Sequence, residues 1–145
     1  MNVKVKKVNP LAIIPKYQTK DAAGFDFHSL ITCSVLPGET KKVPTGLSFE
    51  IPIGCEIQVR PRSGLSAKTK LRVCNSPGTV DADFRGEVLV LIENIGKEVE
   101  TICTYDRIAQ GVLCPVFQAE FIEVDELSES ERGNGGFGST NEKKS

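Results

Sequence analysis

The chain has 145 residues, of which 39% are hydrophobic, and a formal net charge of -1 at pH 7. That length allows one domain with a sizeable core and is too short for two ordinary domains. The near-neutral charge excludes the excess of clustered cations that duplex nucleic acid or an acidic membrane surface requires, so we expect no direct nucleic-acid binding and only local binding of phosphate.

The cysteines and the N-terminus indicate the compartment. The five cysteines are odd in number and no two have CxxC spacing, so neither a disulfide framework nor a zinc site is expected and a reducing compartment fits better. The N-terminal MNVKVKKVNP has cations but no apolar stretch after them, and no run of about 18 apolar residues occurs. We therefore expect a soluble, cytoplasmic protein without a membrane span.

The first half of the chain predicts strands joined by short turns. Residues 3–8 begin by alternating apolar residues with lysine, and residues 31–36 and 40–51 flank the turn at Pro37 and Gly38. Residues 55–60 alternate apolar and polar side chains, as a half-buried strand does. Because tryptophan is absent, the core must come mainly from Val, Ile, Leu and Phe, which favours strands.

The segment DAAGFDFHS at residues 21–29 predicts a strand that follows a loop. Its alternation places Asp26 on the opposite strand face from Phe25 and Phe27. His28 is the only histidine, and a lone histidine is more often a surface or packed residue than a base or ligand.

Residues 61–70, PRSGLSAKTK, contain the one stretch suited to a short helix. Arg62, Ser63 and Gly64 precede it, and a cation, a hydroxyl and free backbone N–H groups at a helix start can cradle a phosphate. The alternative is a simple helix cap with Ser63 as the capping residue.

The segment NSPGTVDADFRGE at residues 75–87 combines a turn with carboxylates. Asp81 and Asp83 follow the turn residues and precede the apolar residues 88–92, which predict a strand that needs cover on both faces, one of them available from another subunit. A carboxylate at a hairpin tip suits a base that holds a water molecule. An ordinary acidic hairpin is the alternative.

The last predicted strands are followed by a tail. Residues 98–104 and 108–116 are strand-like. Gln110 lies within the second of these and needs a hydrogen-bond partner. It is either an amide whose bonds are satisfied in the core or at an interface, or a group that orients water or phosphate. From residue 125 the composition turns to Glu, Ser and Gly, which predicts a flexible tail over residues 125–145. Its glycines fit GxGxxG only literally, because no strand precedes them and no helix follows. A cation, a ring and hydroxyls among the glycines indicate a lid that closes over a ligand.

Five separated stretches, in order, resemble the five motifs of the trimeric dUTP diphosphatases (dUTPases). They are AAGFDFHS (residues 22–29), PRSGLS (61–66), NSPGTVDADFRGE (75–87), RIAQGVLCPV (107–116) and RGNGGFGST (132–140). The resemblance implies an all-β, jelly-roll-like β-barrel over residues 1–124, with one short helix and the flexible lid-bearing tail. It also implies a homotrimer with sites at subunit interfaces.

The implied reaction is Mg²⁺-assisted hydrolysis of dUTP to dUMP and pyrophosphate, which limits uracil incorporation into DNA and supplies dUMP for thymidylate synthesis. By matching position, Asp81 would activate the water that attacks the α-phosphorus, and Asp26 would reach Mg²⁺ through water. Phe137 would stack on uracil. The positions implied for the uracil and the deoxyribose are Asn75, Gly78, Thr79, Val80, Phe84 and Leu89. Those implied for the phosphates are Arg62, Ser63, Gly64, Gln110, Arg132, Gly138 and Ser139.

Two details of the 75–87 segment refine this assignment. Phe84 stands where the family usually has tyrosine, so a ring that excludes a 2′-hydroxyl remains but the phenol hydrogen bond is lost. Asp83 is interpreted as a structural partner of a nearby donor such as Arg85.

Two alternatives to a dUTPase remain. A dCTP deaminase shares the fold, but the glutamate that acts in that family corresponds to Ile92 here, and Glu93 is expected on the other strand face. The second alternative is a trimeric nucleotide-binding protein without catalytic activity. The presence of Asp81, Arg132 and Phe137 argues against it.

Overall fold

The structure is a computed structural model that describes residues 1–141. Its regular secondary structure consists of strands and one short helix, α1 (Ser63–Lys68). The strands are β1 (Lys4–Lys7), β2 (Phe25–His28), β3 (Cys33–Val35), β4 (Thr40–Pro44), β5 (Leu47–Glu50), β6 (Cys55–Arg60), β7 (Leu71–Val73), β8 (Gly78–Val80), β9 (Leu89–Asn94), β10 (Glu100–Ile102) and β11 (Arg107–Pro115).

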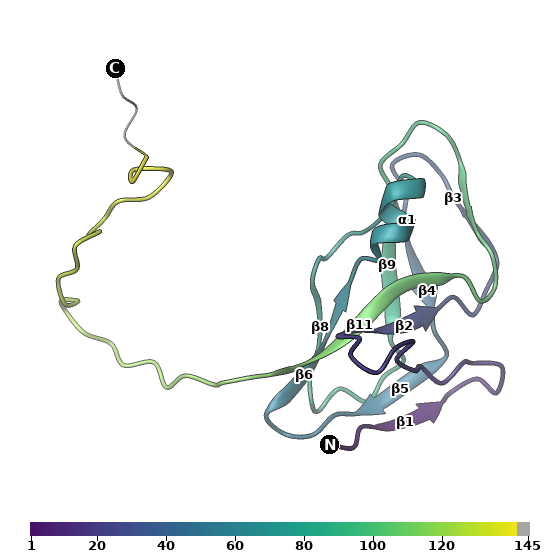
Figure 1. The fold of residues 1–145 in the computed structure, drawn as a ribbon, viewed down its shortest axis with the longest axis horizontal. Helices are drawn as coiled ribbons and strands as arrows, with labels where there is room; N and C mark the ends of the chain where they lie inside the picture. The colour runs from purple at the N-terminus through teal and green to yellow at the C-terminus, as the bar shows by residue number, and fades with distance from the viewer. Residues whose placement is uncertain (142–145) are drawn as a thin grey trace.

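The strands form an antiparallel, jelly-roll-like barrel (Figure 1). One sheet has the order β2-β11-β6-β8, a second has the order β4-β9-β7, and the pairs β1-β5 and β10-β3 complete the walls. The core lies between these sheets, and its most deeply buried members include Phe27, Ile57, Ile92 and Ile108. The predicted all-β barrel with one short helix is confirmed.

Alternation along the strands determines which residues enter the core. In β6, whose bounds agree with the predicted 55–60, Ile57 and Val59 are buried while their neighbours are partly exposed. In β9, Val90 and Ile92 are buried, but Leu89 on the other face is 42% exposed. The chain itself therefore covers only one face of β9.

A row of aromatic rings packs edge to face beneath β2. The ring of Phe25 meets that of Tyr17 edge to face at 5.7 Å and that of Phe27 at 5.4 Å, and Phe27 meets Phe49 at 6.0 Å. A Cβ atom added at Gly111 on β11 would collide with the Phe25 and Phe27 rings, so the rings occupy the space a side chain would need. Packing of this kind requires glycine at that position.

Helix α1 corrects one sequence expectation. Its N-cap is Arg62, which makes no side-chain capping bond, and Ser63 is already the first helical residue. The interpretation of Ser63 as the capping residue is therefore wrong. The helix ends where Thr69 donates both its backbone N–H and its hydroxyl to the carbonyl of Leu65, at 3.0 and 2.7 Å.

Beyond β11 the chain leaves the barrel as an extended arm (Figure 1). Residues 116–141 contain no helix or strand, and Phe117 and Phe121 on this arm are each 95% exposed. The predicted tail of residues 125–145 falls on this arm, and its residues 142–145 lie outside the described part. In residues 1–141 no helix is long and apolar enough to cross a membrane.

Candidate active site

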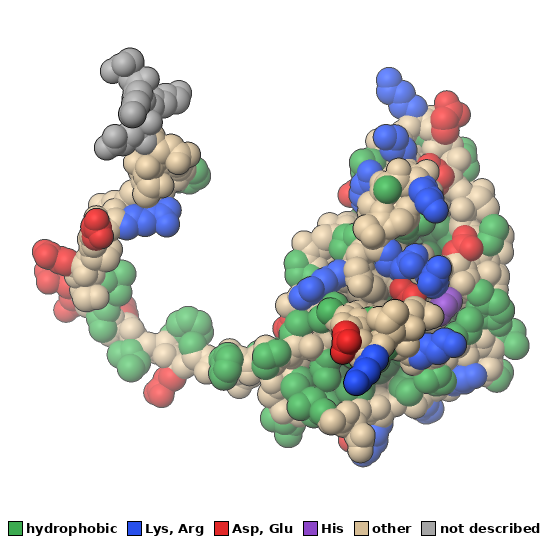
Figure 2. Space-filling model, in the orientation of Figure 1, with side chains coloured by type: hydrophobic (Ala, Val, Ile, Leu, Met, Phe, Trp, Pro, Cys, Tyr) green, Lys and Arg blue, Asp and Glu red, His purple; other side chains and the backbone are tan. Residues whose placement is uncertain are grey.

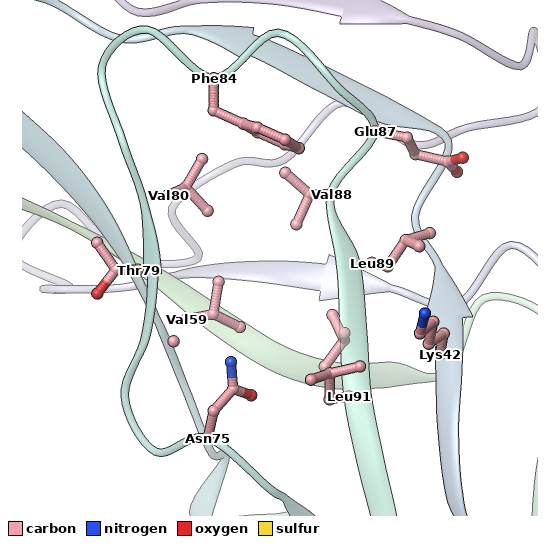
Figure 3. Close-up of a pocket in the computed structure, with 12 residues that line it drawn as sticks. Lys42, Val59, Asn75, Thr79, Val80, Phe84, Glu87, Val88, Leu89 and Leu91 are labelled. Carbon is pink, nitrogen blue, oxygen red and sulfur yellow. The ribbon is translucent and has the colours of Figure 1, made fainter.

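The hairpin that joins β8 to β9 opens into a pocket of about 290 Å³ (Figure 3). Its wall combines apolar side chains from both strands with the turn before β8. It is lined by Lys42, Val59, Asn75, Gly78, Thr79, Val80, Phe84, Glu87, Val88, Leu89, Val90 and Leu91. The six barrel positions predicted for the uracil and the deoxyribose all lie in this set, so the fold brings them together.

The turn at the base of the pocket is shaped by close backbone contact. A Cβ atom added at Gly78 would lie 3.0 Å from Nδ2 of Asn75 and 3.4 Å from Cβ of Val59. The hydroxyl of Ser76 donates to the carbonyl of Val73 at 2.6 Å, and the Ser76-Pro77 peptide bond is cis. The Asn75 amide and the Gly78 backbone are therefore packed against each other at the pocket floor.

The Phe84 ring closes the other end of the pocket. A Cβ atom added at Gly86 would lie 2.6 Å from Cζ of Phe84, so the ring rests on the Gly86 backbone. Figure 3 shows the ring directed toward Val88 across the hairpin. Phe84 is 44% exposed, and its outer side is open to solvent.

The strand that leaves this hairpin is fixed to the turn between β4 and β5. The N–H of Gly46 donates to Oε1 of Glu87 at 2.8 Å, and the hydroxyl of Thr45 donates to the carbonyl of Val88 at 2.7 Å. Glu87 and Lys42 line the pocket but were not predicted. Lys42 arrives by pairing with Leu91 across β4 and β9, a contact that no local sequence signal indicates.

Asp81 lies outside this pocket. It is exposed just after β8, and together with Asp83 and Glu56 it lines a separate hollow of about 620 Å³. The expectation that Asp83 pairs with Arg85 is wrong. Within residues 1–141, Nη1 of Arg85 donates instead to the backbone carbonyls of Ala82 at 2.7 Å and Phe84 at 3.3 Å. Within one chain, the proposed base and the pocket of the hairpin therefore face different hollows.

A cationic cluster surrounds Asp26 on the outer face of the β2-β11-β6 sheet. Nε of Arg62 donates to Oδ1 of Asp26 at 2.7 Å, and Nη1 of Arg107 donates to Oδ2 at 3.4 Å. The Asp26 side chain is only 11% exposed, so two guanidinium groups compensate a nearly buried carboxylate. Figure 2 shows the single histidine, His28, beside Lys and Arg side chains on this face.

His28 is half-buried next to this cluster. Its Nδ1 is buried and has no hydrogen-bond partner in the described part of the chain. Burial lowers the pKa of His28, and the positive charges of Arg107 and Arg62 act in the same direction against the opposing charge of Asp26. The imidazole is therefore held in its neutral form more firmly than an exposed histidine.

Gln110 joins the cluster from the central strand β11. It is paired with Asp26 on one side and with Arg60 on the other, and Nε2 donates to the carbonyl of Pro61 at 2.9 Å. The side chain packs so closely on Gly24 that a Cβ atom there would collide with Oε1 of Gln110. Ser63 and Gly64 follow Arg62 directly at the exposed start of α1.

The predicted lid residues are not brought to the barrel. Nε of Arg132 donates to the carbonyl of Gly135 at 2.7 Å within the tail, and Phe137 is fully exposed with φ of 52°. Gly138 has φ of 81°, a left-handed conformation that glycine adopts without steric cost, and Ser139 follows it. The segment lies away from the barrel (Figure 1).

The donors available for a metal ion are few. In residues 1–141 no group of three or more His, Cys, Asp or Glu side chains could hold an ion. Asp26 is the acidic group nearest the arginines, and both its oxygens accept from them.

The barrel therefore carries a hairpin pocket and a sheet face on which Arg62 and Arg107 contact Asp26. The sequence model of the dUTPase family matches residues 11–141. The deoxyuridine 5'-triphosphate nucleotidohydrolase of Nautilia profundicola is 56% identical over 97% of this chain and 99% of its own length. That of Bdellovibrio bacteriovorus is 55% identical over 95% of each chain.

Solved structures agree with this relationship. A point mutant of the Staphylococcus bacteriophage 80alpha dUTPase with dUpNHpp is similar with a TM-score of 0.91 and 28% identity, over 96% of this chain and 98% of that chain. A second mutant of the same enzyme, also with dUpNHpp, has a TM-score of 0.90 and 30% identity over 95% and 97% of the two chains. The chain belongs to the dUTPase family.

Proposed function

We propose that this protein is a dUTP diphosphatase, which hydrolyses dUTP to dUMP and pyrophosphate. The observation that carries the proposal is the hairpin pocket, where Asn75, Gly78 and Phe84 meet in one 290 Å³ hollow. Relatives that are 56% and 55% identical are named deoxyuridine 5'-triphosphate nucleotidohydrolases, and related dUTPase structures hold the dUTP analogue dUpNHpp.

Uracil is read by the floor of the pocket. The Asn75 amide can both donate and accept, and the adjacent Gly78 backbone adds a donor and an acceptor at fixed positions. Cytosine reverses the polarity at two edge atoms, which leaves buried groups unpaired at a cost of about 1–3 kcal/mol each. The tight Asn75–Gly78 contact also supports exclusion of the 5-methyl group of thymine.

The deoxyribose lies against Phe84, with Thr79, Val80 and Leu89 in the remaining wall. An apolar ring at the 2′ position offers no hydrogen-bond partner to a ribose hydroxyl, so UTP is disfavoured by desolvation. Because Phe84 lacks a phenol, it rejects the hydroxyl only through the bulk and the apolar character of its ring.

The phosphates are held by the sheet face beside Asp26. Arg62 and Gln110 meet there, and Ser63 and Gly64 extend the donor set at the start of α1. Guanidinium and amide donors suit phosphate oxygens because charge-assisted hydrogen bonds are the stronger ones.

Asp81 acts as the general base that takes a proton from the attacking water, whose oxygen then bonds to the α-phosphorus as the bond to the bridging oxygen breaks. Asp81 and the hairpin pocket face different hollows of one chain, which supports a site completed by other subunits. We propose a homotrimer for this reason. The uncovered face of β9, with Leu89 42% exposed, gives such an assembly an apolar surface.

The tail supplies the remaining groups after it closes. Arg132 and the Gly138-Ser139 backbone bind the terminal phosphate, and Phe137 stacks on the uracil. The full exposure of Phe137 and the left-handed glycines around it support a segment that binds only when substrate is present.

Mg²⁺ bound to the triphosphate would neutralise its charge, with Asp26 reaching it through a water molecule. The cell would use this reaction to limit uracil incorporation into DNA and to supply dUMP for thymidylate synthesis. The five free thiols support a cytoplasmic location. A deaminase is not favoured, because the position that corresponds to the acting glutamate of that family holds Ile92, which is fully buried. The neighbouring Glu93 lies on the opposite face of β9.

The test is product analysis after incubation with dUTP and Mg²⁺. Chromatography should detect dUMP and pyrophosphate in equal amounts. Ammonia release from dCTP would favour the deaminase, and binding of dUTP without products would favour a non-catalytic protein.

A further inference from the structure

Arg60 lies on the same sheet face as the phosphate-binding cluster proposed above. It pairs with Gln110 across β6 and β11, and Gln110 pairs with Asp26 across β11 and β2. Directly paired residues of antiparallel strands project to the same side of a sheet. Arg60, Gln110 and Asp26 therefore form one row across three strands.

The Arg60 guanidinium is held in place by neutral groups. Nε and Nη2 donate to Oε1 of Gln58 at 3.0 and 2.7 Å, and Nη2 also lies 3.7 Å from Sγ of Cys114. Its Nη1 has no hydrogen-bond partner in residues 1–141. The Gln58 amide therefore fixes the orientation of the Arg60 guanidinium, while Nη1 stays available to a ligand.

The charge of Arg60 is not compensated. Both Arg62 and Arg107 bond to Asp26, whereas the ion pairs of the described residues include none with Arg60. Asp26 stands two strands away, about 10 Å across the sheet. Glu56, farther along the same face of β6, lines the separate hollow of Asp81.

This uncompensated cation borders an open hollow of about 470 Å³. The hollow is lined by Gln58, Arg60, Pro61, Ser76, Pro77 and Gln110, with no acidic side chain among them. Gln110 is already a proposed phosphate ligand, so the hollow continues the phosphate site. A fixed guanidinium with a free nitrogen in a hollow without carboxylates favours a multiply charged anion.

We propose that Arg60 is a further binding residue for the pyrophosphate half of the substrate, the part that dUMP lacks. The inference rests on the proposed function and extends it beyond the residues matched to the family motifs. Arg60 adds a third guanidinium to those of Arg62 and Arg107, which share one carboxylate.

The experiment compares the affinities of the full-length wild type and three variants for dUpNHpp and dUMP by isothermal titration calorimetry. Arg60→Gln should weaken dUpNHpp binding by about tenfold, the factor that about 1.4 kcal/mol corresponds to, with little change for dUMP. Arg60→Lys should recover part of the loss. Arg72→Gln is the matched control, because within residues 1–141 Arg72 donates only to the backbone carbonyls of Thr69 and Leu71.

Two results would overturn the role of Arg60. One is unchanged dUpNHpp affinity in Arg60→Gln, and the other is an equal loss for dUMP and dUpNHpp, which a merely structural role would produce. A parallel assay separates this inference from the proposed function. Wild-type protein that binds dUpNHpp through Arg60 but forms no dUMP from dUTP would overturn the function and leave the inference standing.

Discussion

Arg62 and Asp26 form the shortest ion pair on the sheet face of the candidate site, with Nε 2.7 Å from Oδ1. The proposed roles assign one of them to phosphate and the other to the environment of Mg²⁺. Their direct contact means that each neutralises the other in the protein alone. Bound substrate would have to share the Arg62 guanidinium with Asp26, whose second oxygen stays near Arg107.

Asp26→Asn should affect both stability and the Mg²⁺ requirement. The change leaves two guanidinium groups without their carboxylate, but the side chains of Arg62 and Arg107 are 24% and 48% exposed, so water compensates part of the loss. We expect a decrease of about 1–2 kcal/mol in the free energy of unfolding, measured by urea denaturation. The Mg²⁺ concentration for half-maximal turnover should rise, and an unchanged Mg²⁺ titration would contradict the proposed role of Asp26.

Asp81→Asn should separate binding from chemistry. The amide keeps the shape of the side chain but cannot accept the proton, so the rate of turnover should fall by about 10²–10⁴-fold while dUpNHpp affinity changes little. Single-turnover kinetics with dUTP measures the chemical step. Asp83→Asn is the matched control, because it removes a neighbouring exposed carboxylate, and a variant of Asp81 that turns over like wild type would remove Asp81 from the mechanism.

Truncation after Ser130 should spare the barrel and abolish activity. The removed segment makes its polar contacts within the tail, such as that between Arg132 and Gly135, and none of them ties it to the barrel in residues 1–141. We therefore expect an unchanged unfolding transition and an unchanged mass in light scattering. Truncation after Asn141 is the control that keeps the motif, and full dUTP hydrolysis by the shorter protein would refute the lid.

Gly111→Ala should destabilise the barrel. The added methyl group would collide with the Phe25 and Phe27 rings, which are themselves packed edge to face. Overpacking of this kind costs about 1–3 kcal/mol, measured as a shift in the urea midpoint. Gly136→Ala, where no atom lies within 4 Å of the added Cβ, should leave the midpoint unchanged.

Local patterns predicted most of the fold because each strand carries its own alternation. The bounds of β6 agree with the prediction, and the opposition of Asp26 to Phe25 and Phe27 follows directly from the two-residue period. The alternative that made Ser63 the helix cap is wrong, because Ser63 is already the first helical residue and Arg62 is the N-cap.

The contacts between distant segments of the site could not be predicted from local sequence patterns. The contacts of Arg62 with Asp26 and of Lys42 with Leu91 join segments far apart in the chain, and strand register decides them. The expected bond between Asp83 and Arg85 gave way to backbone carbonyls, which lie closer to the guanidinium in the turn. Local charge complementarity therefore predicted the wrong acceptor there.

The most direct test of the proposed function is pyrophosphate release by the wild-type protein from dUTP, UTP, dCTP and dTTP, each with and without Mg²⁺. The pocket of Asn75, Gly78 and Phe84 predicts rapid release from dUTP with Mg²⁺, with dCTP and dTTP strongly disfavoured. UTP should be the best of the poor substrates, because only the Phe84 ring rejects its 2′-hydroxyl. Equal release from all four nucleotides, or none from dUTP, would contradict the proposed function.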